Sequence, residues 1–293
     1  MKTIKTITLS AIAAALLFAG CCKDNDTTPT GSAKVKVSVN DFTISQEEIP
    51  SKDAIASYNG VKAVTLAFYT SDGTEAYKTT QLREDATTYT TFGEFDLSLP
   101  MGSYTMVVLG YALYDDDALT LTSPTQAEYT AGCPRETFAT TQAVNITSTN
   151  DVSLSATLDR IVTKLQVVST DAKTANANKV RMTFSAGGKA FSPTTGLATV
   201  NTGSISTVGI SAAVGSTSSS IGYLFLATDE QTMTVTIDVL DSEGNSISHK
   251  VVNNVPLKRN RCTKLTGSLY TAGNVDGSFS VNTTWLDEYD MNF

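Results

Sequence analysis

Residues 34–39 read Lys34-Val35-Lys36-Val37-Ser38-Val39, which is the alternation of a β-strand. Successive strand side chains point to opposite faces of a sheet, so the three valines share one face and the polar residues the other. Two further apolar residues extend this face after an irregularity at residues 40–41. The pattern predicts a strand at residues 34–44 that fills an apolar groove with Val35, Val37, Val39, Phe42 and Ile44.

Period-two alternation recurs along the rest of the chain and predicts an all-β protein. Clear examples lie at residues 61–69, 103–111, 180–184 and 233–239, with turn-forming residues between the predicted strands. Residues 115–134 are expected to form a long irregular loop, and the Gly-, Ser- and Thr-rich residues 196–220 to carry one weak strand at 205–214. The pattern contains no amphipathic helix of ordinary length. Many short strands with frequent turns indicate β-sandwiches.

The length of the chain and one interruption of the period-two alternation predict two domains. The chain has 293 residues, and a typical domain has about 100–200. The segment at residues 158–162 interrupts the alternation. We therefore expect β-sandwiches at residues 34–158 and 159–293, preceded by a leader at residues 1–20 and a flexible tether at residues 21–33.

The first residues have the features of an export signal. Lys2 and Lys5 precede an apolar run at residues 7–18, which is too short for a membrane span of about 20 residues. Cys21 follows directly on Ala19-Gly20, and this arrangement resembles the lipobox of bacterial lipoproteins. The resemblance implies that the Cys21 sulfur is acylated, for example with palmitate, and that Cys21 is the first mature residue. The rest of the chain is then expected to be anchored through this lipid to the outer membrane and exposed at the cell surface.

Composition and motifs argue against most enzymatic and nucleic-acid functions. The net charge is −8, and no basic stripe is available to bind phosphates, so no nucleic-acid partner is expected. His249 is the single histidine, lies among polar residues of a predicted strand and is expected to face solvent. No Cys or His cluster has metal-ligand spacing, the acidic run at residues 115–117 is expected to be a solvated loop, and no cofactor is expected. The number of carboxylates leaves glycosidase chemistry open, so a hydrolase is kept as a third hypothesis, after the two that are given below.

Two cysteines remain once Cys21 and its neighbour Cys22 are assigned to the lipid and the tether. Cys133 and Cys262 form a candidate disulfide, because an exported protein meets an oxidising environment. The spacing does not show that they meet, and two separate thiols are the favoured interpretation.

The order of several segments resembles the fimbrillin family of Bacteroidetes type V pili, including its anchor and accessory lipoproteins. These segments are the lipobox, the strand at residues 34–44, the turn LPMGSY at 99–104, LDRIVTK at 158–164 and VPLKRNRCT at 255–263. The resemblance implies two tandem transthyretin-like β-sandwiches that polymerise by donor-strand exchange. In the family a protease cuts after an early strand, usually at arginine. Here the loop at residues 46–59 contains only Lys52 as a basic residue, which favours an anchor or accessory subunit over a stalk subunit.

The leading hypothesis is therefore a non-enzymatic, lipid-anchored subunit of a cell-surface fimbria, with other fimbrial subunits as partners. The alternative is a surface lipoprotein that binds glycan or host protein through its sandwich loops. An open apolar groove under residues 34–44 would favour fimbrial assembly, and an exposed aromatic cluster would favour glycan binding.

Overall fold

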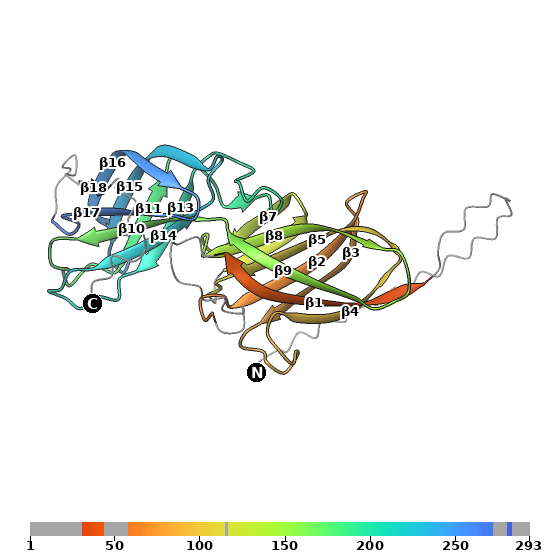
Figure 1. Ribbon diagram of the computed structural model, residues 1–293. Coiled ribbons are helices and arrows are strands. Elements are labelled where there is room, and N and C mark those ends of the chain that lie inside the picture. The colour runs from red at the N-terminus through yellow and green to blue at the C-terminus, as the bar shows by residue number, and fades with distance from the viewer. Residues whose placement is uncertain (1–30, 44–57, 115–116, 272–279, 283–293) are drawn as a thin grey trace, which may run out of the picture. The chain divides into compact units, whose positions relative to one another are not determined.

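The computed structural model describes residues 31–43, 58–114, 117–271 and 280–282, and of residues 40–43 and 280–282 only the backbone. All regular elements within these ranges are β-strands, so the prediction of an all-β fold is confirmed (Figure 1). No helix in the described part of the chain is long and apolar enough to cross a membrane.

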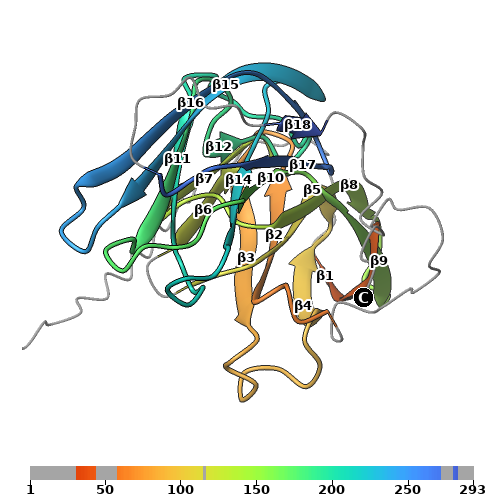
Figure 2. The ribbon, with the colours of Figure 1, turned by 90° about the vertical axis from the view of Figure 1, so that its left-hand side faces the viewer.

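The first half of the chain builds one seven-stranded sheet. Its strands, in spatial order, are β3 (Glu75–Leu82), β2 (Ala63–Thr70), β5 (Gly102–Tyr111), β8 (Thr137–Ile146), β9 (Val152–Arg160), β1 (Ser32–Thr43) and β4 (Glu94–Pro100). β8 and β9 pair at only two positions. The sheet bends there, so that β9, β1 and β4 face the other strands across one apolar core (Figure 2). Val35, Val37, Leu66, Phe68 and Met106 lie in this core.

The second half of the chain forms a sandwich of two four-stranded sheets. One sheet contains β14 (Ser219–Leu224), β10 (Thr163–Ser169), β17 (Cys262–Gly267) and β18 (Ser280–Asn282). The other contains β13 (Ser204–Gly209), β11 (Lys179–Phe184), β15 (Glu230–Leu240) and β16 (Ser246–Lys258). Val180, Met182, Val235 and Ile237 alternate inward from β11 and β15 and fill the space between the sheets. The structure thus contains two β-sandwiches in tandem.

A third apolar cluster covers the outer face of β2, β5 and β8. Residues 115–134 do not form the predicted irregular loop, because most of them build the hairpin β6 (Ala118–Ser123) and β7 (Gln126–Ala131). Leu121 and Tyr129 of this hairpin pack on the outer face, and β12 (Ala190–Phe191) pairs with β7. Phe191 stacks on Phe225 with ring centroids 4.2 Å apart. β2 is therefore buried on both faces and lacks the burial alternation of a half-exposed strand.

The cluster on β2, β5 and β8 also joins the two halves of the chain. Ile161, Val162, Phe191 and Phe225 share it with residues of the first sheet, and the described residues from Gly31 onward form one compact unit. The domain limits at residues 158 and 159 stay a prediction. The predicted weak strand at 205–214 is shorter than expected, since β13 ends at Gly209.

Candidate functional site

The predicted groove-filling strand lies inside the first sheet rather than at its edge. β1 pairs in parallel with β9, from Val35 opposite Val152 to Thr43 opposite Asp159. On its other side it pairs antiparallel with β4, from Ser32 opposite Pro100 to Ser38 opposite Glu94. Its register with β9 shifts between Val39 and Asp41, which confirms the predicted irregularity. Backbone groups on both sides of β1 therefore have strand partners.

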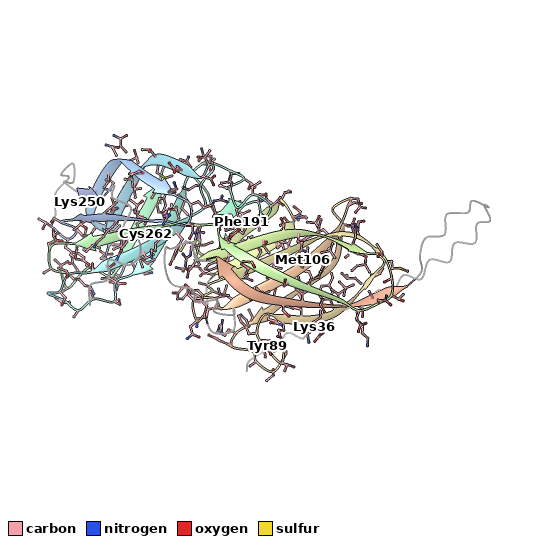
Figure 3. All side chains as sticks on the ribbon, in the orientation of Figure 1. Lys36, Tyr89, Met106, Phe191, Lys250 and Cys262 are labelled. Atoms are coloured by element: carbon pink, nitrogen blue, oxygen red, sulfur yellow. The ribbon has the colours of Figure 1, made fainter. Side chains whose placement is uncertain are left out.

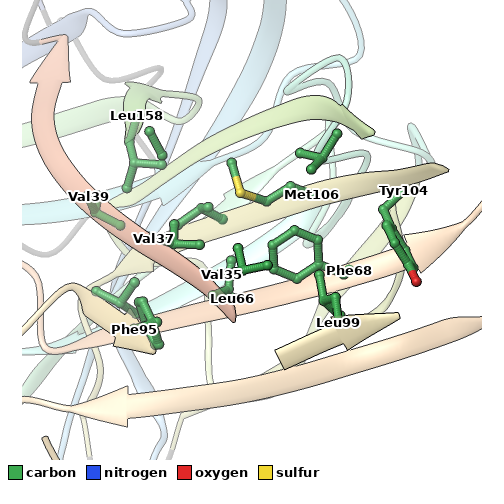
Figure 4. Packing of buried hydrophobic residues seen from close by; sticks show 14 of the residues in the cluster. Val35, Val37, Val39, Leu66, Phe68, Phe95, Leu99, Tyr104, Met106 and Leu158 are labelled. Atoms are coloured by element: carbon green, nitrogen blue, oxygen red, sulfur yellow. The ribbon is translucent and has the colours of Figure 1, made fainter. Parts of the chain in front are cut away.

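The inner face of β1 is part of the core. Val35, Val37 and Val39 are buried and pack in the same cluster as Phe68, Phe95, Leu99 and Met106 (Figure 4). Full burial of one such side chain contributes roughly 1.5–3 kcal/mol. The three valines together therefore supply a substantial part of the stability of this sandwich.

The outer face of β1 is polar. Lys34 and Lys36 are exposed, and Lys36 is labelled beside β1 in Figure 3. They line a surface hollow of about 530 Å³ with Asp96 of β4 and Asp151 before β9. The strand thus has one solvent-exposed, charged face and one buried, apolar face, as the alternation predicts.

β4 depends on β1 for its place in the sheet. β4 is the terminal strand, and β1 is the strand with which it pairs among the described residues. The buried Gln81 amide of β3 provides a second link, since its Nε2 donates to Glu94 O at 2.6 Å and its Oε1 accepts from Gly93 N at 2.8 Å. This side chain imitates the peptide group of a neighbouring strand. Removal of β1 would leave a slot between β9 and β4, with Gln81 still holding the start of β4.

A buried polar cluster lies where β1 and β9 end. Glu136 binds Arg160 at 2.7 Å, and the Tyr58 hydroxyl donates to Glu136 at 3.0 and 3.1 Å. Burial, and then the charge of Glu136, raise the pKa of Tyr58 to about 12, so the hydroxyl remains a donor at neutral pH. Since Thr43 pairs with Asp159, the residues on either side of segment 44–57 are both held near the end of β9.

Several predicted site residues lie outside the described residues. These are Cys21, Ile44 and Lys52, while Phe42 is described only by its backbone, which pairs with Leu158. The candidate disulfide is not formed. Cys133 is buried after β7, Cys262 begins β17, and their thiols are not joined.

His249 is exposed as expected, but it has a buried partner that its polar neighbours did not indicate. Its Nδ1 lies 2.7 Å from Asp238 Oδ1, and the Asp238 carboxylate also accepts from Arg181 and Ser246. Burial opposes ionisation of Asp238, but the hydrogen bonds from His249, Arg181 and Ser246 outweigh it and lower its pKa. Asp238 lies opposite His249 in the pairing of β15 with β16. The cluster links β11, β15 and β16, and within the described residues the Asp238 carboxylate is the hydrogen-bond partner of His249.

The prediction of a solvated acidic loop is wrong at Asp117. Its carboxylate is buried and binds Arg135 Nε at 2.6 Å, because the hairpin β6–β7 brings the two together. Asp115 and Asp116 lie outside the described residues. No group of three or more His, Cys, Asp or Glu side chains that could hold a metal ion occurs in the described ranges.

Asp171 forms a clamp that sequence reasoning missed. It accepts from the backbone N–H groups of Leu269 at 2.7 Å and of Tyr270 and Thr271 at 2.8 Å, and from two hydroxyls. Partial burial alone would raise its pKa, but these hydrogen bonds lower it to about 2. The carboxylate thereby fixes residues 268–271 directly after β17.

Several solved structures are similar to this chain. A candidate adhesin from Bacteroides ovatus is 12% identical, with a TM-score of 0.50 over 86% of this chain and 96% of the other. A candidate polysaccharide-binding protein from Bacteroides thetaiotaomicron is 12% identical, with a TM-score of 0.49 over 85% and 96%. The fimbrial anchor protein Mfa2 from Porphyromonas gingivalis is 12% identical, with a TM-score of 0.46 over 80% and 91%.

At this identity the likeness concerns the fold, and the match to the candidate adhesin from Bacteroides ovatus supports the predicted all-β sandwich fold. No curated protein sequence matches the chain. One family model, described as a family of unknown function (DUF6562), matches residues 29–292. Since that match covers both sandwiches, the chain belongs to the DUF6562 family.

Proposed function

We propose that this chain is a non-enzymatic, lipid-anchored subunit of a cell-surface fimbria, and that it joins its neighbours by β-strand complementation. The position of β1 carries the proposal. β1 pairs on both sides and buries Val35, Val37 and Val39, and it comes first among the strands of the described residues. A strand of this kind can be exchanged for one from another chain without changing the order of the rest of the sheet.

The physical basis is the slot that β1 occupies. Without β1, the facing edges of β9 and β4 would expose unpaired backbone groups above an open apolar groove. Such a slot selects an extended segment with small apolar side chains at every second position. The partners of this chain would be other subunits of the same fimbria. The hydrogen bonds of Gln81 would keep β4 near the slot while β1 is absent.

An anchor or accessory role is favoured over a stalk role. Between Gln46 and Asn59 the chain has no arginine, and Lys52 is its one basic residue. An uncut chain keeps both β1 and the acylated Cys21, so that it ends a fibre at the outer membrane. A glycan-binding role ranks second, because Tyr114 is the one large aromatic side chain that the described part of the molecule exposes strongly.

Substitution at the lipidation site tests this role. Cys21→Ser should remove the acyl chains that supply stable membrane attachment, whereas Cys22→Ser, the matched control, should leave it intact. We expect the Cys21→Ser chain either in the medium, attached to fibres, or unprocessed with its leader still attached. Release of the chain without other subunits would favour the ligand-binding role, and equal membrane retention of both variants after removal of the leader would contradict lipid anchoring.

A further inference from the structure

One long part of the chain carries no charge and exposes aliphatic side chains. Residues 190–228 contain no Asp, Glu, Lys, Arg or His, although charged residues make up 17% of the chain. Of the six large hydrophobic side chains that are exposed in the described ranges, four belong to this run. They are Val200, Ile205, Val214 and Ile221. The run also contains β13 and β14.

β13 and β14 are terminal strands of the two sheets of the second sandwich. They lie beside each other, because a Cβ atom added to Gly222 of β14 would be 3.2 Å from Ser206 Oγ of β13. Terminal strands are usually protected from pairing with other chains by charged side chains, prolines or bulges. These two have no charge and no proline, and the pairing of β13 with β11 is regular.

The hydrogen-bond pattern shows which residues of β13 face its open side. Ile210 N bonds Asn178 O, and Ser185 N bonds Thr234 O on the opposite side of β11. In an antiparallel pair both backbone groups of a residue point to the same neighbour. With the observed register, the even-numbered residues of β13 bond β11. The backbone groups of Ile205 and Thr207 therefore point away from it.

Each of these two strands carries a buried hydroxyl without a partner in the described part of the chain. Ser206 Oγ of β13 and Ser220 Oγ of β14 are buried and have no hydrogen-bond partner among the described residues. A buried polar group without a partner costs roughly 1–3 kcal/mol. A bound chain that supplies a donor or acceptor to one of these hydroxyls would remove the cost for that hydroxyl.

We propose that β13 pairs antiparallel with β13 of a second copy of this chain, about a two-fold axis through Ser206. In this register Ile205 of one copy lies opposite Thr207 of the other, and their outward-pointing backbone groups bond each other. The two Ser206 residues form the intervening pair without backbone bonds, where the Cα atoms come within about 4.5 Å. Their hydroxyls can then bond each other.

The occupant is a second copy for reasons of charge and symmetry. Each chain carries a net charge of −8, so two copies repel each other wherever their acidic surfaces meet. The uncharged face over β13 and β14 avoids that repulsion. A two-fold axis also matches each unpaired Ser206 with an identical group, as an isologous interface does. This pairing uses the second sandwich and is independent of the exchange of β1.

Photocrosslinking in intact cells that make the full chain tests the proposal. A benzoylphenylalanine in place of Ile205 should give an adduct of twice the chain mass. The same residue in place of Leu82, which is 43% exposed in the first sandwich, should give none. Adding Thr207→Lys to the chain with the probe at 205 should lower the yield of the crosslinked adduct by about tenfold, because the lysine places a charge in the uncharged interface. A tenfold loss requires the pairing to weaken by only about 1.4 kcal/mol.

The controls separate pairing from misfolding. Thr207 is exposed, so Thr207→Lys should leave the melting temperature of the purified chain unchanged. Thr207→Ser, which keeps the surface uncharged, should retain the adduct. The proposal is overturned by the absence of an adduct at 205, by an adduct with a different protein, or by an adduct that persists in folded Thr207→Lys.

Discussion

At the scale of single residues, Asp171 accepts five hydrogen bonds from one short segment of the second sandwich. One carboxylate holds three consecutive backbone N–H groups and two hydroxyls of residues 268–271. Its partners are 97–100 residues away in the sequence. A lone aspartate after a strand gives no sign of such distant partners, so the sequence could not predict this clamp.

The lowered pKa of Asp171 predicts a loss of stability in acid. Its pKa is about 2 in the folded chain and about 4 when unfolded. Its contribution is therefore fully present above pH of about 4 and is lost as the pH falls towards 2. The site is partly exposed, so we expect about 1 kcal/mol after solvent screening. Urea unfolding between pH 5 and pH 2 measures it.

Asp171→Asn is the matched variant for this measurement. The amide keeps the size of the side chain but has one acceptor oxygen in place of two. We expect lower stability at pH 5 and a shallower fall in stability below pH 4 than in the unchanged chain. An equally steep fall in the variant would show that other carboxylates control the acid response.

At the scale of elements, β1 is the strand on which the proposed function depends. Val37 and Lys36 are neighbours on it, one wholly buried and one exposed. Val37→Ser removes apolar contacts and buries a hydroxyl, and should lower the free energy of unfolding by roughly 2–4 kcal/mol. Lys36→Ser should change it by less than about 0.5 kcal/mol. Chemical denaturation of the two variants checks the difference, and equal losses would contradict the buried position of β1.

The strands differ in how far the sequence could predict them. β1 could be predicted because one of its faces is exposed to solvent, so that its valines alternate with lysines and serine. The hairpin β6–β7 was missed, although Leu119 and Leu121 alternate with threonines and Pro124 marks its turn. The acidic residues before it and the cysteine and proline after it are typical of a loop. The Gln81 bridge could not be predicted, because it depends on how the whole sheet curls to bring β3 near β4.

At the scale of the whole molecule, the chain combines the strand that we propose to be exchanged with further apolar clusters that hold other strands. The first sandwich keeps β2, β5 and β8 covered on their outer face by the hairpin β6–β7 and by Phe191 and Phe225. None of the described side chains of β1 belongs to that cluster. Loss of β1 should thus open the first core while leaving the outer cluster and the second sandwich in place. The fold class followed from the sequence, but this division of the core among three clusters needed the structure.

Strand complementation is tested most directly by adding β1 back as a separate peptide. The chain is produced from residue 53 onward, and a labelled peptide of residues 32–45 is titrated into it while fluorescence anisotropy is recorded. We expect saturable binding that restores a soluble species of single-chain size, and at least tenfold weaker binding of the peptide with Val37→Ser, since each 1.4 kcal/mol is a factor of about ten. A shortened chain that stays soluble with an unchanged melting temperature and does not bind the peptide would contradict strand complementation.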